Sequence, residues 1–257
     1  MISIFKRNKK DRDVSIYKRM VALDVYYESE KKDGLKDYIS GLIIKLPDLG
    51  YHISVVHSEV EETYEDFCKN MKKKDFNSGL IISDSNSPES VFYVKHSSTL
   101  SSMTFWFEYN QTRLNNIVDL TLKGNNLYFA SLYSQYDNKW ENEEQILVYE
   151  RNEKSQKGKK YTKDIFDKKC IDVSFNYGRT EKINNIGFTA GWKMWFGAEF
   201  PNNLKTKLGS LNSIRLNEND GVTEIQLFND LISVDYEKNR PVQKQFLELI
   251  KTTYNNV

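Results

Sequence analysis

Long apolar runs are absent from this sequence of 257 residues, and its densest apolar stretch, residues 186–200, is interrupted by glycine, lysine and glutamate. A membrane-spanning helix needs about 18 or more consecutive apolar residues, so we predict no such helix and no membrane partner. The short apolar run at residues 1–5 stands in front of basic residues, whereas a secretory signal peptide has its basic residues first. We therefore expect a cytoplasmic protein.

Cysteine and histidine are also scarce, with two and three residues respectively. Cys68 and Cys170 stand in no Cys-x-x-Cys or Cys/His pattern, so we expect neither a disulfide framework nor a zinc site, and we predict two buried free thiols. His52 and His57 are five residues apart and would fall on opposite faces of a strand, while His96 lies at a predicted strand end. The histidines predict no metal centre and no acid–base pair.

A strong charge of one sign is lacking as well, because 37 lysines and arginines nearly balance 36 aspartates and glutamates. Without a strong overall field we expect no nucleic-acid partner. The phosphate-binding motif GxxxxGK[ST], the nucleophile motif GxSxG and the zinc motif HExxH are all absent. We therefore predict no cofactor, no metal and no catalytic residues.

Hydrophobic residues make up 39% and aromatic residues 13% of the chain, which is typical of a folded protein rich in sheet-forming side chains. Residues 20–27 and 51–57 alternate apolar and polar positions and predict strands. Apolar side chains recur at helical spacing in three segments, residues 35–46, 60–71 and 241–254. Each of these segments predicts an amphipathic helix.

The rest of the chain predicts closely spaced strands, first at residues 80–83, 91–96, 102–109, 117–123, 127–133 and 145–149. The Gly-Asn-Asn connection at 124–126 is typical of a hairpin, so neighbouring strands should pair antiparallel. Further strands are predicted at residues 170–177, 192–197, 213–216, 222–228 and 231–236. We predict an α+β fold with mainly antiparallel sheet packed against a few amphipathic helices.

The domain organisation is predicted from changes in polarity along the chain. Residues 1–13 are charged and predict a frayed terminus. Residues 152–163 are polar, contain five lysines and predict a loop or linker. On either side lie an α+β half at residues 14–151 and a β-rich half at residues 164–257, which a helix closes. The sequence leaves open whether the two halves share one core.

Two tryptophans are predicted on the outer faces of strands. In residues 103–109 the apolar side chains at odd positions share one face, which places Trp106 on the other face. In residues 192–197 the even positions form the inner face, which places Trp195 outside with Lys193. Exposed tryptophans are typical of protein interfaces, so Trp106 and Trp195 are candidate partner contacts. A helix that covers Trp106 is the alternative interpretation.

The second half carries a residue order that resembles a known family. The motif Gly-Trp-Lys-Met-Trp-Phe-Gly at residues 191–197 is followed by Pro201, and Gly-Val-Thr-Glu-Ile-Gln-Leu at residues 221–227 leads toward the closing helix. This order resembles immunity proteins of bacterial polymorphic toxin systems, the type 52 immunity family in particular. The resemblance implies a cytoplasmic protein that binds and neutralises one cognate toxin and performs no chemistry of its own.

Two other functions stay open from the residues alone. An enzyme could assemble a dispersed carboxylate site around a divalent ion, for which Asp235 and Glu237 are the residues to test, although a solvated strand edge explains this pair as well. A carbohydrate-binding or structural module with exposed aromatic platforms is the third hypothesis. The sequence does not fix the oligomeric state.

Overall fold

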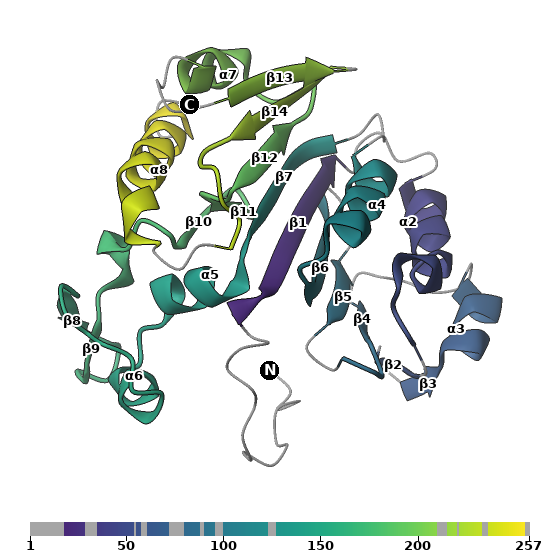
Figure 1. Ribbon diagram of the computed structural model, residues 1–257, viewed down its shortest axis with the longest axis horizontal. Helices are drawn as coiled ribbons and strands as arrows, with labels where there is room; N and C mark the ends of the chain where they lie inside the picture. The colour runs from purple at the N-terminus through teal and green to yellow at the C-terminus, as the bar shows by residue number, and fades with distance from the viewer. Residues whose placement is uncertain are drawn as a thin grey trace.

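The computed structural model describes residues 18–28, 35–53, 55–57, 61–71, 80–87, 90–95, 100–122, 127–209, 215–219, 221–232 and 236–254. The fold is α+β, as predicted, and its main feature is a ten-stranded sheet with helices on both faces (Figure 1). Among the described residues, the helices are all too short or too polar to cross a membrane.

All neighbouring strands of the large sheet pair antiparallel, in the order β13-β14-β12-β7-β1-β6-β5-β4-β2-β3. The strands are β1 (Met20–Glu28), β2 (Val55–His57), β3 (Glu61–Thr63), β4 (Leu80–Ser83), β5 (Val91–Lys95), β6 (Leu100–Glu108), β7 (Leu127–Ser134), β12 (Lys193–Phe196), β13 (Arg215–Asn219) and β14 (Val222–Gln226). Two small hairpins stand apart, formed by β8 (Tyr161–Lys163) with β9 (Lys169–Ile171), and by β10 (Thr180–Ile183) with β11 (Ile186–Thr189). Strands from both predicted halves lie in the one large sheet, so residues 152–163 do not separate two sheets.

The described helices are α2 (Leu35–Ile44), α3 (Tyr64–Asn70), α4 (Gln111–Thr121), α5 (Gln135–Asn142), α6 (Ile146–Arg151), α7 (Asn202–Gly209) and α8 (Arg240–Tyr254), with 3-10 turns at η1 (Pro47–Leu49), η3 (Val173–Phe175) and η4 (Glu237–Asn239). The predicted helices at residues 35–46 and 241–254 are confirmed as α2 and α8, whereas α4, α5, α6 and α7 were not predicted. In α8, Pro241 occupies the first turn, where its missing N–H costs nothing.

Two hydrophobic cores lie on opposite faces of the sheet. The neighbouring residues Phe129 and Ala130 of β7 belong to different cores, as do Met194 and Trp195 of β12, and successive side chains of a strand point to opposite faces. Helices α2 and α4 contribute to the first core, over β1, β4, β5 and β6, while α7 and α8 contribute to the second, over β7, β12 and β14 (Figure 1). Helices α2 and α4 cover one face of β1, β4, β5 and β6, whereas α7 and α8 lie on the opposite face further along the sheet. The second face of β1, β4, β5 and β6 is therefore partly exposed to solvent.

Several predicted strands are wrong. Residues 117–123 were expected to be a strand, but residues 117–121 belong to α4, Leu122 caps its end, and residue 123 lies outside the described part. The start of α4 is capped by the Asn110 side chain, which accepts a hydrogen bond from the Arg113 backbone N–H. Residues 145–149 begin α6, and the predicted strand 170–177 ends at residue 171 and passes into η3. The predicted hairpin at 124–126 lies outside the described residues, yet β7 pairs with β1 and β12 rather than with residues 117–123.

Other predicted elements are shortened or divided. Of the predicted strand 51–57, residues 55–57 form β2 and residues 51–53 are not in a strand, while residue 54 lies outside the described part. The described part of the predicted helix at 60–71 divides into β3 and α3. Residues 231 and 232 are not in a strand, and residues 233–235 lie outside the described part. Both cysteines are free, as predicted, but they are half-buried rather than buried.

The aromatic stretch at 186–200 contains two strands, of which β12 matches the strand predicted at residues 192–197 and β11 was not predicted. β11 belongs to a small hairpin and β12 to the large sheet, with a break at residues 190–192. Its glycines allow β12 to approach β7: a Cβ at Gly191 would overlap the Leu132 carbonyl oxygen, and one at Gly197 would overlap that of Leu127. The glycines thus serve close backbone packing at both ends of β12.

Candidate functional site

Trp106 lies near the end of β6 on a half-exposed sheet face, on the side of the strand that the sequence predicted. Burial alternates along β6, and the indole is 38% exposed while both flanking residues are buried. Its cross-strand neighbours are the smaller Val91 and Ala22, so the ring stands above them. We call this surface the open face, defined by the partly exposed or exposed residues Asp24, Ile81, Ser83, Val91, Tyr93, Ser102, Thr104 and Trp106.

The carboxylate of Asp24 lies within the open face, where Asp24 pairs with Thr104, two residues before Trp106 on β6. Thr104 donates a hydrogen bond to Asp24 Oδ1 and Tyr133 donates one to Asp24 Oδ2, each at 2.7 Å. Burial raises the pKa of Asp24, and these two hydrogen bonds oppose part of that rise. The charge of Asp24 in turn adds to the effect of burial in raising the pKa of Tyr26. Asp24 therefore joins β1, β6 and β7 through side chains on one face.

Trp195 does not lie on an outer surface, and this prediction is wrong. The side chain is only 5% exposed, belongs to the first core, and donates a hydrogen bond from Nε1 to Glu224 Oε2 at 2.8 Å. Strand parity was correct, since Trp195 and Met194 do point to opposite faces. Both faces of β12 are buried, however, so the residue is structural and is not available to a partner.

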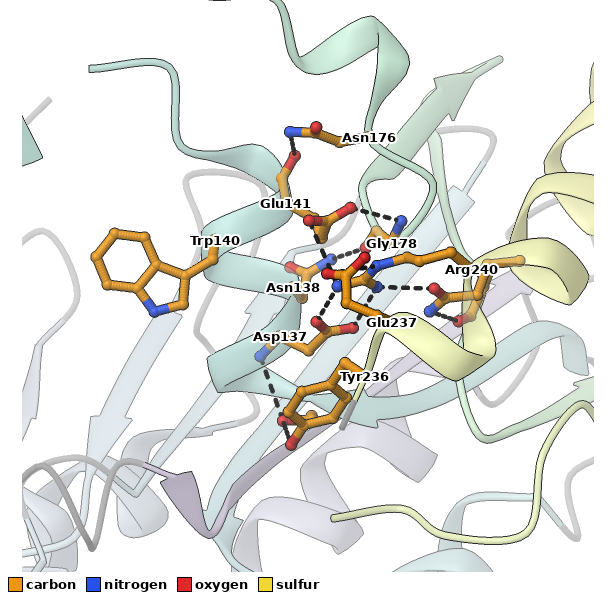
Figure 2. Close-up of polar contacts among 12 residues, drawn as sticks. Asp137, Asn138, Trp140, Glu141, Asn176, Gly178, Tyr236, Glu237 and Arg240 are labelled. Atoms are coloured by element: carbon orange, nitrogen blue, oxygen red, sulfur yellow. Dashed lines mark hydrogen bonds and ion pairs between the residues drawn. The ribbon is translucent and has the colours of Figure 1, made fainter. Parts of the chain in front are cut away.

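A buried polar cluster joins α5, α8 and the segment at residues 176–178 (Figure 2). The two Nη atoms of Arg240 donate to the two carboxylate oxygens of Asp137, at 2.9 and 2.6 Å. Arg240 also lies 3.4 Å from Glu141, whose carboxylate accepts from Lys159 at 2.9 Å and from the Gly178 backbone N–H at 3.1 Å. We call Asp137, Glu141, Lys159 and Arg240 the ion cluster.

The ion cluster is internally balanced, with two carboxylates and two cations in contact. Burial raises the pKa of Asp137, while the hydrogen bonds and charge of Arg240 lower it. A depression of about 250 Å³, which includes space open to solvent, lies beside the cluster and is lined by Tyr133, Asp137 and Gln243 among others. Only about 10 Å³ of this space could hold the centre of a bound water molecule, which is room for about one water and not for a larger ligand. The arrangement fits a structural clamp, by which we mean ion pairs that hold α5, α8 and residues 176–178 together, better than a reaction centre.

The carboxylate pair considered for an enzyme cannot be assembled from the described residues. Asp235 lies outside them, while the Glu237 side chain is 82% exposed and 3.7 Å from Arg240 Nε. Within the described part of the chain, no group of three or more metal-ligating side chains comes together. His52 is exposed, at 3.9 Å from Asp84, and His96 is outside the described residues.

Sequence reasoning missed two features that the structure brings out. The ion cluster joins residues up to 103 positions apart, so no local pattern announces it. The β8–β9 hairpin carries Ile165 and Phe166 at its tip, exposed by 92% and 73%. Its signal was an apolar pair between two aspartates in an otherwise lysine-rich segment.

Comparisons with known proteins give a fold and no family. No family model matches the chain, and no curated protein sequence matches it. Among solved structures, the chain is similar to the Pseudomonas aeruginosa T6SS protein PA0821, with a TM-score of 0.50 and 11% sequence identity over 90% of this chain and 73% of that chain. At this identity the similarity concerns the fold alone.

Proposed function

We propose that this protein is an immunity protein that binds and neutralises one cognate bacterial toxin in the cytoplasm, without catalysis of its own. The observation that carries the proposal is the open face, where Trp106 is 38% exposed above smaller neighbours on a regular antiparallel sheet. Tryptophan is enriched among the residues that dominate binding energy at protein interfaces. A rigid strand also holds the indole in place before binding, which lowers the entropic cost of association.

Two further observations support a binding role in a toxin system. The sequence order at 191–197 and 221–227 resembles immunity proteins, and the fold resembles that of a protein described as belonging to a type VI secretion system, which is compatible with a bacterial toxin context. The charged side chains of the ion cluster are also occupied by one another, which accounts for them without a substrate.

The proposal is tested by binding measurements with the purified product of the adjacent upstream gene. Trp106→Ala should weaken the complex by about 2 kcal/mol, or roughly 30-fold in Kd, because truncation removes a large ring from the centre of the contact. The variant should also lose about 1–2 kcal/mol of stability, since more than half of the side chain is buried on the sheet, so binding is compared well below the unfolding temperature.

Ile44→Ala is the matched control, because Ile44 is a 57% exposed apolar side chain at the end of α2. This variant should bind like the wild type. If the wild-type protein does not bind the neighbouring gene product, the immunity proposal is wrong. If it binds and Trp106→Ala binds equally well, the open face is not the contact surface.

A further inference from the structure

The β8–β9 hairpin exposes two large apolar side chains on an ordered turn. Ile165 and Phe166 form its tip and are among the most exposed large apolar residues of the described chain, at 92% and 73%. Exposing apolar side chains to water is energetically unfavourable, and exposed apolar groups held in an ordered turn commonly mark contact sites. The hairpin and α6 project together at one end of the molecule (Figure 1).

The tip is held in one conformation by its flanking aspartates. Asp164 Oδ1 accepts hydrogen bonds from the backbone N–H groups of Phe166 and Lys168, at 2.8 and 2.9 Å. Asp167 adopts a left-handed conformation with φ of 61° and forms an ion pair with Lys163 at 2.8 Å. The turn therefore presents the apolar pair without a large ordering cost on binding.

The base of the hairpin is fixed to the body of the protein. Ile171 is buried with Trp140 and Tyr149 in a small third core, and its N–H donates to the Glu144 carbonyl oxygen at 2.9 Å. Lys159, just before β8, is bound by Glu141 in the ion cluster. The projecting tip is therefore rigidly coupled to the sheet rather than tethered by a loose loop.

The charge around the tip defines the kind of partner. Residues 154–169 contain seven lysines and two aspartates, which gives the segment a net charge of +5 in a chain whose total is +1. A basic projection complements a carboxylate-rich surface and speeds encounter with it. Asp164 and Asp167 bracket the apolar tip and all seven lysines lie outside them, so the complementary surface is apolar opposite the tip and carboxylate-rich only around it. The proposed function supplies a protein as the partner, and a cleft on a protein provides such an arrangement.

We propose that the β8–β9 hairpin enters a cleft of the cognate toxin that has an apolar floor and an acidic rim. This inference rests on the proposed function and names the element that would block the toxin. Ile165 and Phe166 fill the floor of the cleft, and the lysines on both sides of the tip face its rim.

The test compares the double variant Ile165→Ser/Phe166→Ser with Leu147→Ser, an equally polar change at a 60% exposed apolar residue of α6. Affinity for the purified product of the adjacent upstream gene is measured by titration calorimetry. The hairpin variant should bind about 30-fold more weakly or worse, and the control should stay within about threefold of the wild type. Both should keep the wild-type unfolding temperature, because the replaced side chains are exposed.

A charge variant tests the acidic rim separately. Lys157→Glu/Lys168→Glu should slow association by about tenfold at low ionic strength and reduce its dependence on salt. An unchanged association rate would overturn the acidic rim.

The outcomes separate the two proposals. If the wild type binds and Trp106→Ala weakens binding while the hairpin variant does not, the hairpin inference is wrong and the proposed function stands. If the wild type does not bind at all, both are wrong. If the wild type sediments with phosphatidylglycerol vesicles and the hairpin variant does not, the hairpin serves a membrane and the assignment to a protein cleft is overturned.

Discussion

Replacing Arg240 with alanine should lower the free energy of unfolding by about 3–5 kcal/mol at pH 8, because it leaves buried carboxylates without their cation. Arg240 makes two charged hydrogen bonds to Asp137 and lies 3.4 Å from Glu141. Lys159 still neutralises Glu141 in the variant, so most of the cost falls on Asp137. Its carboxylate loses both of its bonds to Arg240, and in the wild type this side chain is only 11% exposed.

The loss at Arg240 should depend on pH in a defined direction. Burial already raises the folded-state pKa of Asp137 above its ordinary value of 3.8, and without Arg240 the pKa rises further. A carboxyl group with a raised folded-state pKa favours the folded state at low pH, and that contribution is lost as the pH rises through the folded-state pKa. The destabilisation of Arg240→Ala should therefore shrink as the pH falls from 8 toward 4.

Urea unfolding of wild type and variant at several pH values measures this effect. Lys238→Ala is the control, since Lys238 pairs with Asp230 at 3.2 Å on the exposed surface and should contribute about 1 kcal/mol or less. A loss below about 1 kcal/mol for Arg240→Ala at pH 8, or a loss that stays constant down to pH 4, would refute the clamp.

Two further predictions follow from buried side chains. Trp195→Ala should destabilise the protein by about 3–5 kcal/mol in urea unfolding, because it opens a cavity in the first core and leaves Glu224 without its hydrogen bond from the indole N–H. An effect near zero would mean that Trp195 is a surface residue after all. Asp24→Asn should stabilise the protein at pH 8, because burial raises the pKa of Asp24 above 3.8 and thus disfavours its charged form. As for Asp137, the raised folded-state pKa means that Asp24 favours the folded state below about pH 4, and this contribution is lost as the pH rises through the folded-state pKa. The stability gained by the asparagine variant should therefore fade toward pH 4. A variant less stable than the wild type at pH 8 would contradict this prediction.

Local pattern was sufficient for the fold class and for α2 and α8, but not for α4. The stripe at residues 35–46 predicted α2, and the one at residues 241–254 predicted α8, because each runs over several turns and contributes to a core. The pattern failed at residues 117–123, where Val118, Leu120 and Leu122 alternate as in a strand. The helical face of α4 extends back to Leu114, and its cap lies at Asn110, so a longer window was needed.

Local sequence pattern also could not predict which of the two tryptophans is exposed in the folded protein. Trp106 and Trp195 have similar strand patterns, and parity places each opposite its apolar neighbours. One is exposed and the other buried, because the helices change face along the sheet and both sides of β12 are filled. Residues far apart in sequence decide that difference. Arg240 and Asp137 likewise meet only through the fold.

Growth rescue of a bacterial host is the decisive experiment for the proposed immunity function. The adjacent upstream gene is expressed from an inducible promoter in a bacterial host, alone and together with this protein, and colony formation and co-purification are scored. The account predicts that the neighbour alone stops growth, that the wild-type protein restores it through a stable complex, and that Trp106→Ala restores it less well at equal protein level. A harmless neighbour, or rescue without a complex, would contradict the account.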